Sequence, residues 1–188
     1  MSLEIKNRVQ SSSLKTLDLD IFYPKMELVS LDIKPWLKND LLVIEKDFRE
    51  HLSLFKWDKF KNKAVAIICS VDAIVPHWAY MLISSKLKSL NIANVIGNIK
   101  NLELLLIKQA VNNYDFSDYN NKPIIIKGCS DQKLPLASYS IVLEKLQPIA
   151  KSIMFGEACS SVPVSYTHLR AHETKANLVC RLLLEKKK

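Results

Sequence analysis

Short apolar segments alternate with helical ones in the second half of the chain, and this alternation constrains the fold more than any other feature. Short β-rich runs predict strands at 63–68, 94–97, 122–127 and 152–155. Between these runs, the apolar residues have the spacing of helices over 76–90, 101–110 and 135–146. Strands alternating with helices are typical of a parallel sheet with crossover helices. We therefore predict an α/β fold with a mostly parallel sheet of about four strands.

The first third of the chain has a different pattern. Residues 14–33 alternate loosely between apolar and polar side chains, which predicts a short extended or hairpin element. Residues 43–55 have the spacing of an amphipathic helix. No linker-like stretch follows. We expect residues 1–62 to be a small N-terminal α+β extension of a parallel βαβ core at 63–163, within one domain.

Composition excludes several classes of protein. With 188 residues, of which 48% are hydrophobic and 24% charged, the chain can bury a core. Three glycines leave no glycine-rich phosphate loop. No apolar run reaches the roughly 20 residues of a membrane span, and no secretory signal begins the chain. Together with few cysteines, this predicts a cytoplasmic protein without membrane contact.

Half of the formal charge of +8 lies in residues 164–188. This segment resembles a translated sequencing adapter, so we set it aside as a non-native tail. The remaining residues hold two arginines and no basic stripe. Their densest basic cluster is Lys56, Lys59, Lys61 and Lys63, which is typical of a solvated connection. A nucleic-acid partner is therefore not expected, and the sequence identifies no other partner.

The chain leaves a predicted strand and meets Cys-Ser three times, and a proline follows each time. The pairs are Cys69-Ser70, Cys129-Ser130 and Cys159-Ser160. Parallel strands point their carboxyl ends to one edge of a sheet, where open α/β proteins bind ligands. The three thiols are therefore predicted to converge at that edge, although they are distant in the sequence.

Three thiolates form a soft site suited to zinc or an iron–sulfur cluster. A fourth ligand is available in Asp72, His77, Glu157 or a water molecule. Gly128 and Gly156 would let the backbone approach a ligand closely. Ser70, Ser130 and Ser160 are expected to support the site or to cap helices and turns.

Two alternatives remain open. Cysteine is often a small buried hydrophobe, and no Cys-x-x-Cys spacing is present, so the chain is alternatively a non-catalytic scaffold or partner-binding module. The second alternative is a metal-free enzyme that uses one cysteine as nucleophile. The sequence does not decide whether the protein is an enzyme, and it specifies no substrate.

Several stretches resemble one known family. They are residues 69–81, 126–130 and 151–163, with shorter matches at 17–19, 22–24 and 45–49. These motifs are long and free of gaps, and they are similar to the domain-of-unknown-function 2480 family of bacterial proteins. The similarity spans about residues 4–163. The resemblance implies one domain of about this size, without an established activity and without catalytic residues to carry over.

Overall fold

The computed structural model describes residues 13–127, 134–157 and 160–166, which fold as two compact units. The three-stranded unit comprises residues 21–114 and 134–139. The four-stranded unit holds the other described residues. No helix in these described ranges is both long enough and apolar enough to cross a membrane. The units are named after their sheets and described separately below.

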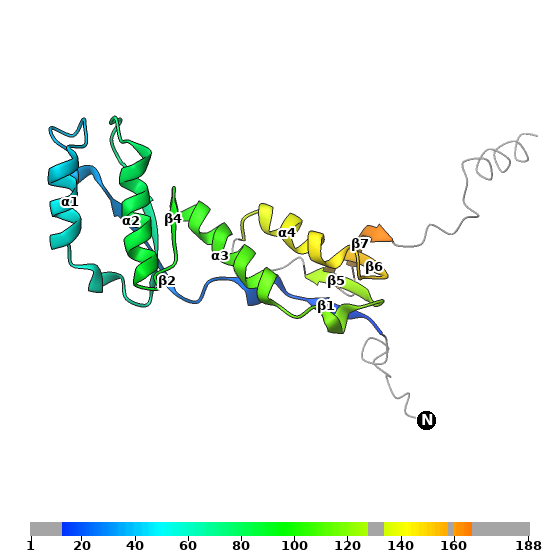
Figure 1. The fold of residues 1–188 in the computed structure, drawn as a ribbon. Coiled ribbons are helices and arrows are strands. Elements are labelled where there is room, and N and C mark those ends of the chain that lie inside the picture. Colours follow the sequence, from blue (N-terminus) through cyan, green and yellow to red (C-terminus); the bar gives the residue numbers. More distant parts are fainter. Residues whose placement is uncertain (1–12, 128–133, 158–159, 167–188) are drawn as a thin grey trace, which may run out of the picture. The chain divides into compact units, whose positions relative to one another are not determined.

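The sheet of the three-stranded unit is entirely parallel, in the order β2-β3-β4 (Figure 1). Its strands are β2 (Glu27–Asp32), β3 (Lys63–Ile68) and β4 (Asn94–Ile96). The central strand β3 is buried at four successive positions, because both faces of the sheet are covered. The continuous apolar run at 64–68 in the sequence predicts this strand.

Alternating side chains of β3 pack into two separate cores. Val65 and Ile67 face a cluster that includes Phe48 of α1 (Glu45–Leu54) and Ile83 of α2 (His77–Ser89). The opposite face presents Ala64 and Ala66, which pack against Leu102 and Leu106 of α3 (Ile99–Asn113). The period of two along a strand therefore places α1 and α2 on one face and α3 on the other.

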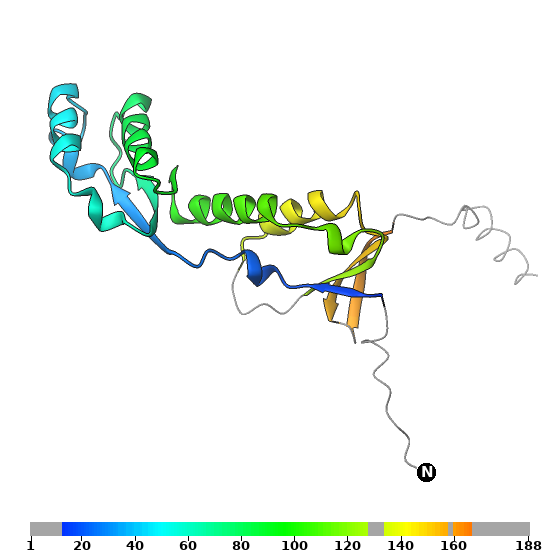
Figure 2. The ribbon, with the colours of Figure 1, turned by 60° about the horizontal axis from the view of Figure 1, so that its bottom comes forward.

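The sheet of the four-stranded unit has the order β1-β5-β6-β7 and draws on distant parts of the chain. Its strands are β1 (Lys15–Leu17), β5 (Pro123–Lys127), β6 (Ser152–Glu157) and β7 (Ser160–Tyr166). β5 pairs in parallel with both β1 and β6, whereas β7 runs antiparallel to β6. Figure 2 shows blue β1 in the same sheet as the orange strands from the other end of the described chain.

The α/β class and the mostly parallel four-stranded sheet are confirmed, but the strands are distributed differently from the prediction. β3 and β4 belong to one sheet, and β5 and β6 belong to another. β1 and β2 do not pair as a hairpin, because each joins a different sheet in parallel. β7 extends past residue 163, into the segment that we set aside. The domain boundaries at residues 62 and 163 stay predictions.

The predicted helices are present, with shifted ends. α3 begins two residues earlier than expected, since Asn98 and not Asn101 is its N-cap. The two asparagines form a reciprocal capping box, in which each side chain accepts the backbone N–H of the other. The fourth helix, α4 (Ala137–Leu146), follows the stretch 128–133 that lies outside the described residues.

Candidate functional site

The carboxyl edge of the three-stranded sheet is organised by Asp32. Asp32 ends β2 and pairs in register with Ile68, which ends β3. Its Oδ1 accepts the backbone N–H of Lys34 at 3.0 Å and that of Ser70 at 3.1 Å. One carboxylate therefore holds the two chain segments that leave the neighbouring strands.

Hydrogen bonding keeps the Asp32 carboxylate charged. Burial alone would raise its pKa. The hydrogen bonds from the Ser70 side chain and from the backbone of Lys34 and Ser70, with the positive charge of Lys34, outweigh burial and lower the pKa below the ordinary value. A fixed negative charge thus lies at the carboxyl edge.

Cys69 and Tyr80 lie beside this charge. The half-buried thiol of Cys69 donates to the carbonyl oxygen of Val71 at 3.3 Å and packs against the core under α1 and α2. Burial raises the pKa of the Tyr80 phenol on α2, and the nearby Cys69 and Asp32 raise it further. The phenol therefore stays neutral, and its side chain packs against the same core as Cys69.

The four-stranded sheet has a polar carboxyl edge of its own. Lys127 ends β5, and its Nζ contacts Asp18 Oδ2 at 2.8 Å. The hydrogen bond from Lys127 and a second one from the Asp20 backbone lower the pKa of Asp18, in spite of some burial. Lys127 pairs in register with Gly156 of β6, so the two strands end side by side.

The match to a family model covers nearly all of the described chain. The model is that of a protein family of unknown function, DUF2480, and it matches residues 3–167. The chain belongs to the DUF2480 family. This agrees with the motifs recognised in the sequence. No curated protein and no solved structure matches the chain.

The predicted ligand residues of this DUF2480 member are divided between its two units. Cys69 belongs to the three-stranded unit, as do Asp72 and His77, whose side chains are exposed. Glu157 ends β6 in the four-stranded unit. Within residues 13–127, 134–157 and 160–166, no three side chains of the types Cys, His, Asp and Glu are grouped to hold a metal ion.

Two of the three cysteines lie outside the described residues, together with Gly128 and Ser130. They are Cys129 and Cys159, and the shared-site prediction of three converging thiols is therefore untested. Their positions in the sequence are nevertheless informative. Cys129 comes two residues after β5, and Cys159 is one of the two residues between the paired Glu157 and Ser160. Both thus follow strands that are neighbours in one sheet.

Gly156 has a structural reason of its own to be glycine. Its φ of +126° lies in a region that side chains rarely adopt, and an added Cβ would collide with the backbone oxygen of Ser160. The close approach at this glycine is therefore made by the chain's own hairpin between β6 and β7. Ser160 is exposed and begins β7.

Sequence reasoning missed Asp32 and Tyr80 as site residues. Asp32 was assigned to an N-terminal extended element, so nothing indicated that it ends a strand next to Ile68. One signal was available, because Asp32 directly follows residues 28–31, a stretch that is apolar except for Ser30. Recognising that run as a parallel strand would have placed Asp32 at the same edge as Cys69.

Proposed function

We propose that this protein is a thiol-dependent enzyme with Cys69 as its nucleophile. The position of the half-buried Cys69 thiol, directly after β3 at the edge that Asp32 organises, carries the proposal. The carboxyl edge of a parallel sheet is where α/β proteins bind ligands, and a thiol at such an edge can act as a nucleophile towards a bound substrate.

Each residue has a distinct role in the proposed step. The sulfur of Cys69 forms a bond to an electrophilic carbon of the substrate. The leaving group departs with the bonding electron pair and takes up the proton of the thiol. The role proposed for Tyr80, which packs against the same core, is to donate its hydroxyl hydrogen to the sulfur as it attacks. Asp32 holds the segment after β3 in place through the Ser70 N–H.

Alkylation of the full chain by iodoacetamide tests this proposal. Peptide mass spectrometry resolves the rate at each of the four cysteines, in the folded protein and in urea. We expect Cys69 to react at least about tenfold faster in the folded protein than in urea, as activated thiols do. An equal or slower rate in the folded protein would overturn the proposal. Cys180, in the segment that we set aside, reports the reagent's activity within the same sample.

A second candidate function is a thiolate-ligated metal or iron–sulfur centre. The parallel register of β5 and β6 favours it, because Cys129 and Cys159 follow these adjacent strands. Neighbouring strands are about 4.8 Å apart, which is close enough for residues that follow their ends to share one ion. Glu157, the last residue of β6, supplies a carboxylate at the end of that strand. Zinc or iron are the metals that such a ligand set fits.

Metal analysis of anaerobically purified protein tests the second candidate. We expect bound zinc or iron, lost in the Cys129→Ser and Cys159→Ser variants and retained in Cys180→Ser. Cys69→Ser shows whether Cys69 is a third ligand. Protein free of both metals, with all thiols reacting freely, would rule out this centre. It would leave the nucleophile proposal to the alkylation experiment.

A further inference from the structure

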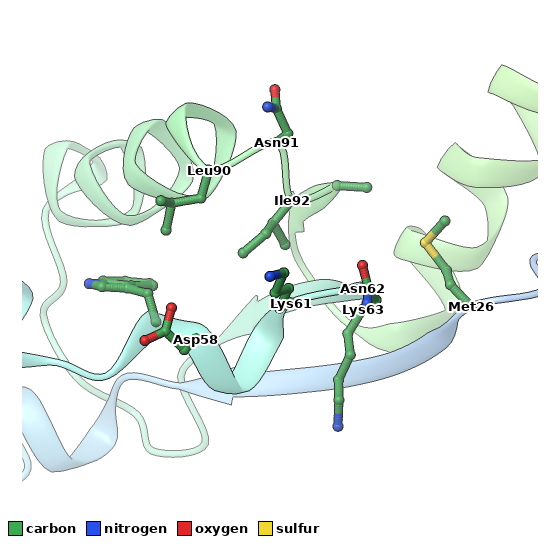
Figure 3. Close-up of a pocket in the computed structure, with 10 residues that line it drawn as sticks. Met26, Asp58, Lys61, Asn62, Lys63, Leu90, Asn91 and Ile92 are labelled. Carbon is green, nitrogen blue, oxygen red and sulfur yellow. The ribbon is translucent and has the colours of Figure 1, made fainter.

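A cavity of about 630 Å³ opens at the opposite, amino edge of the three-stranded sheet (Figure 3). Met26 precedes β2, Lys63 begins β3 and Ala93 precedes β4, and all three residues line the cavity. Its volume lies within the range of roughly 300–1,000 Å³ that is usual for small-molecule sites. This place is remote from Asp32 and Cys69, which follow the carboxyl ends of the same strands.

The cavity has a rigid apolar part. Trp57 is only 8% exposed, and its indole N–H donates to the Leu52 carbonyl at 3.1 Å, which fixes the ring. Leu90 is 45% exposed, so its side chain is accessible to a ligand. Ile92 is 7% exposed and forms a buried apolar wall beside it. In Figure 3, the Leu90 and Ile92 side chains point to the side of the cavity on which Asp58 and Lys61 are drawn. An apolar ligand group fits this part of the cavity.

Two opposite charges line the same cavity without neutralising each other. Lys63 is committed elsewhere, because its Nζ contacts Glu27 at 2.7 Å. Asp58 and Lys61 are exposed, and neither forms a salt bridge with any residue that the structure describes. They are three residues apart in the chain, yet their charged atoms are too far apart to pair with each other.

We propose that this cavity binds a zwitterion with an apolar side chain, that is, an apolar α-amino acid. Its carboxylate binds Lys61, its ammonium group binds Asp58, and its side chain packs against Trp57 and Leu90. A molecule that carries both charges bridges the two groups that the protein leaves apart. A ligand with only one charge forms only one of these two contacts.

Titration of the full chain with L-phenylalanine tests the proposal by calorimetry, with the Trp57 indole N–H followed by NMR. A ligand of this size is expected to bind with a dissociation constant of about 1 mM or below. We expect 3-phenylpropionate and 2-phenylethylamine, which each carry one of the two charges, to bind roughly tenfold more weakly. No binding of L-phenylalanine, or equal binding of all three compounds, overturns the proposal.

Two exposed substitutions separate the two charges without touching the core. Lys61→Gln should weaken binding of L-phenylalanine and 3-phenylpropionate but not of 2-phenylethylamine. Asp58→Asn should weaken binding of L-phenylalanine and 2-phenylethylamine but not of 3-phenylpropionate. Lys59→Gln is the matched control, because Lys59 lies over the Phe55 ring at 4.2 Å and does not line this cavity. If either cavity variant changes all three affinities alike, or none, the assigned charge contacts are wrong.

Discussion

Asp32 and Ser70 lie 38 residues apart in the chain, and the carboxylate of Asp32 accepts the Ser70 N–H at 3.1 Å. This bond joins the ends of β2 and β3, directly beside the Cys69 thiol. It therefore has two roles: it stabilises the sheet edge, and it sets the position of the proposed nucleophile.

Asp32→Asn should make the protein less sensitive to acid. The lowered pKa of Asp32 means that its charged form stabilises the fold above the ordinary carboxyl pKa of about 3.9, and that this contribution is lost as the pH falls through the folded-state pKa. We expect the variant to be about 1 kcal/mol less stable than the wild type at pH 7. Between pH 7 and pH 3, its free energy of unfolding should fall by less than that of the wild type. Urea unfolding at the two pH values measures this.

Asp72→Asn is the control for the acid experiment, because the Asp72 side chain is exposed. Its stability should follow the wild type at both pH values. Should Asp32→Asn have the same pH dependence as the wild type, the hydrogen bonds to Asp32 do not hold its charge.

Tyr80→Phe should slow the alkylation of Cys69. The substitution removes the hydroxyl that is proposed to donate to the sulfur, so the attacking sulfur loses a hydrogen bond. Such bonds contribute about 1.5–3 kcal/mol, and the rate at fixed pH should fall by roughly tenfold or more. Tyr23→Phe is matched to it, since Tyr23 is also a tyrosine with a raised pKa but interacts with Glu103 instead. A rate unchanged by Tyr80→Phe contradicts the proposed role of the phenol.

Gly156→Ala should destabilise the protein more than Gly97→Ala. Both glycines have a positive φ, +126° and +143°, so each substitution adds backbone strain. At Gly156 the new Cβ also collides with the Ser160 backbone, whereas at Gly97 it meets the Asn101 side chain, which can shift at the cost of weakening its hydrogen bond to the Asn98 N–H. We expect about 1 kcal/mol for Gly97→Ala and at least about 2 kcal/mol for Gly156→Ala in denaturant unfolding. Equal losses would show that the collision is relieved.

Asn98→Ala should cost about 1 kcal/mol, because it removes the side chain that accepts the Asn101 N–H at the start of α3. Asn113→Ala, at the last position of the same helix, is the control and should have little effect. Thermal unfolding of the two variants compares these losses. A loss at Asn98 no larger than at Asn113 argues against the capping role.

The separate elements of this fold could be predicted from local sequence, but their pairing could not. The run at 63–68 identifies itself as a buried strand, because every position from Ala64 to Ile67 is apolar. Nothing local indicates that β3 pairs with β2 while β5 pairs with β1. Sheet membership depends on contacts between distant segments, and two sheets with the same strand pattern look alike in a sequence.

The site was predicted only in part, for the same reason. Cys69 was found because it follows an evident strand, and Ser70 came with it. Asp32 was not found, because the strand that carries it was taken for part of an N-terminal extension. Tyr80 lies on the inner side of a predicted helix, where a phenol that packs and a phenol that donates to a thiol have the same sequence signature.

The pairing of β1 with β5 has a consequence for synthesis on the ribosome. Lys15 is the partner of Ile124, so the fully buried Leu17 has no sheet to join until the chain has grown past β5. Residues 21–114 emerge earlier and hold all three strands of their own sheet. Assembly should therefore begin in the middle of the polypeptide and return to its first strand only after β5 has been made, which exposes that strand to chaperones and proteases for much of translation.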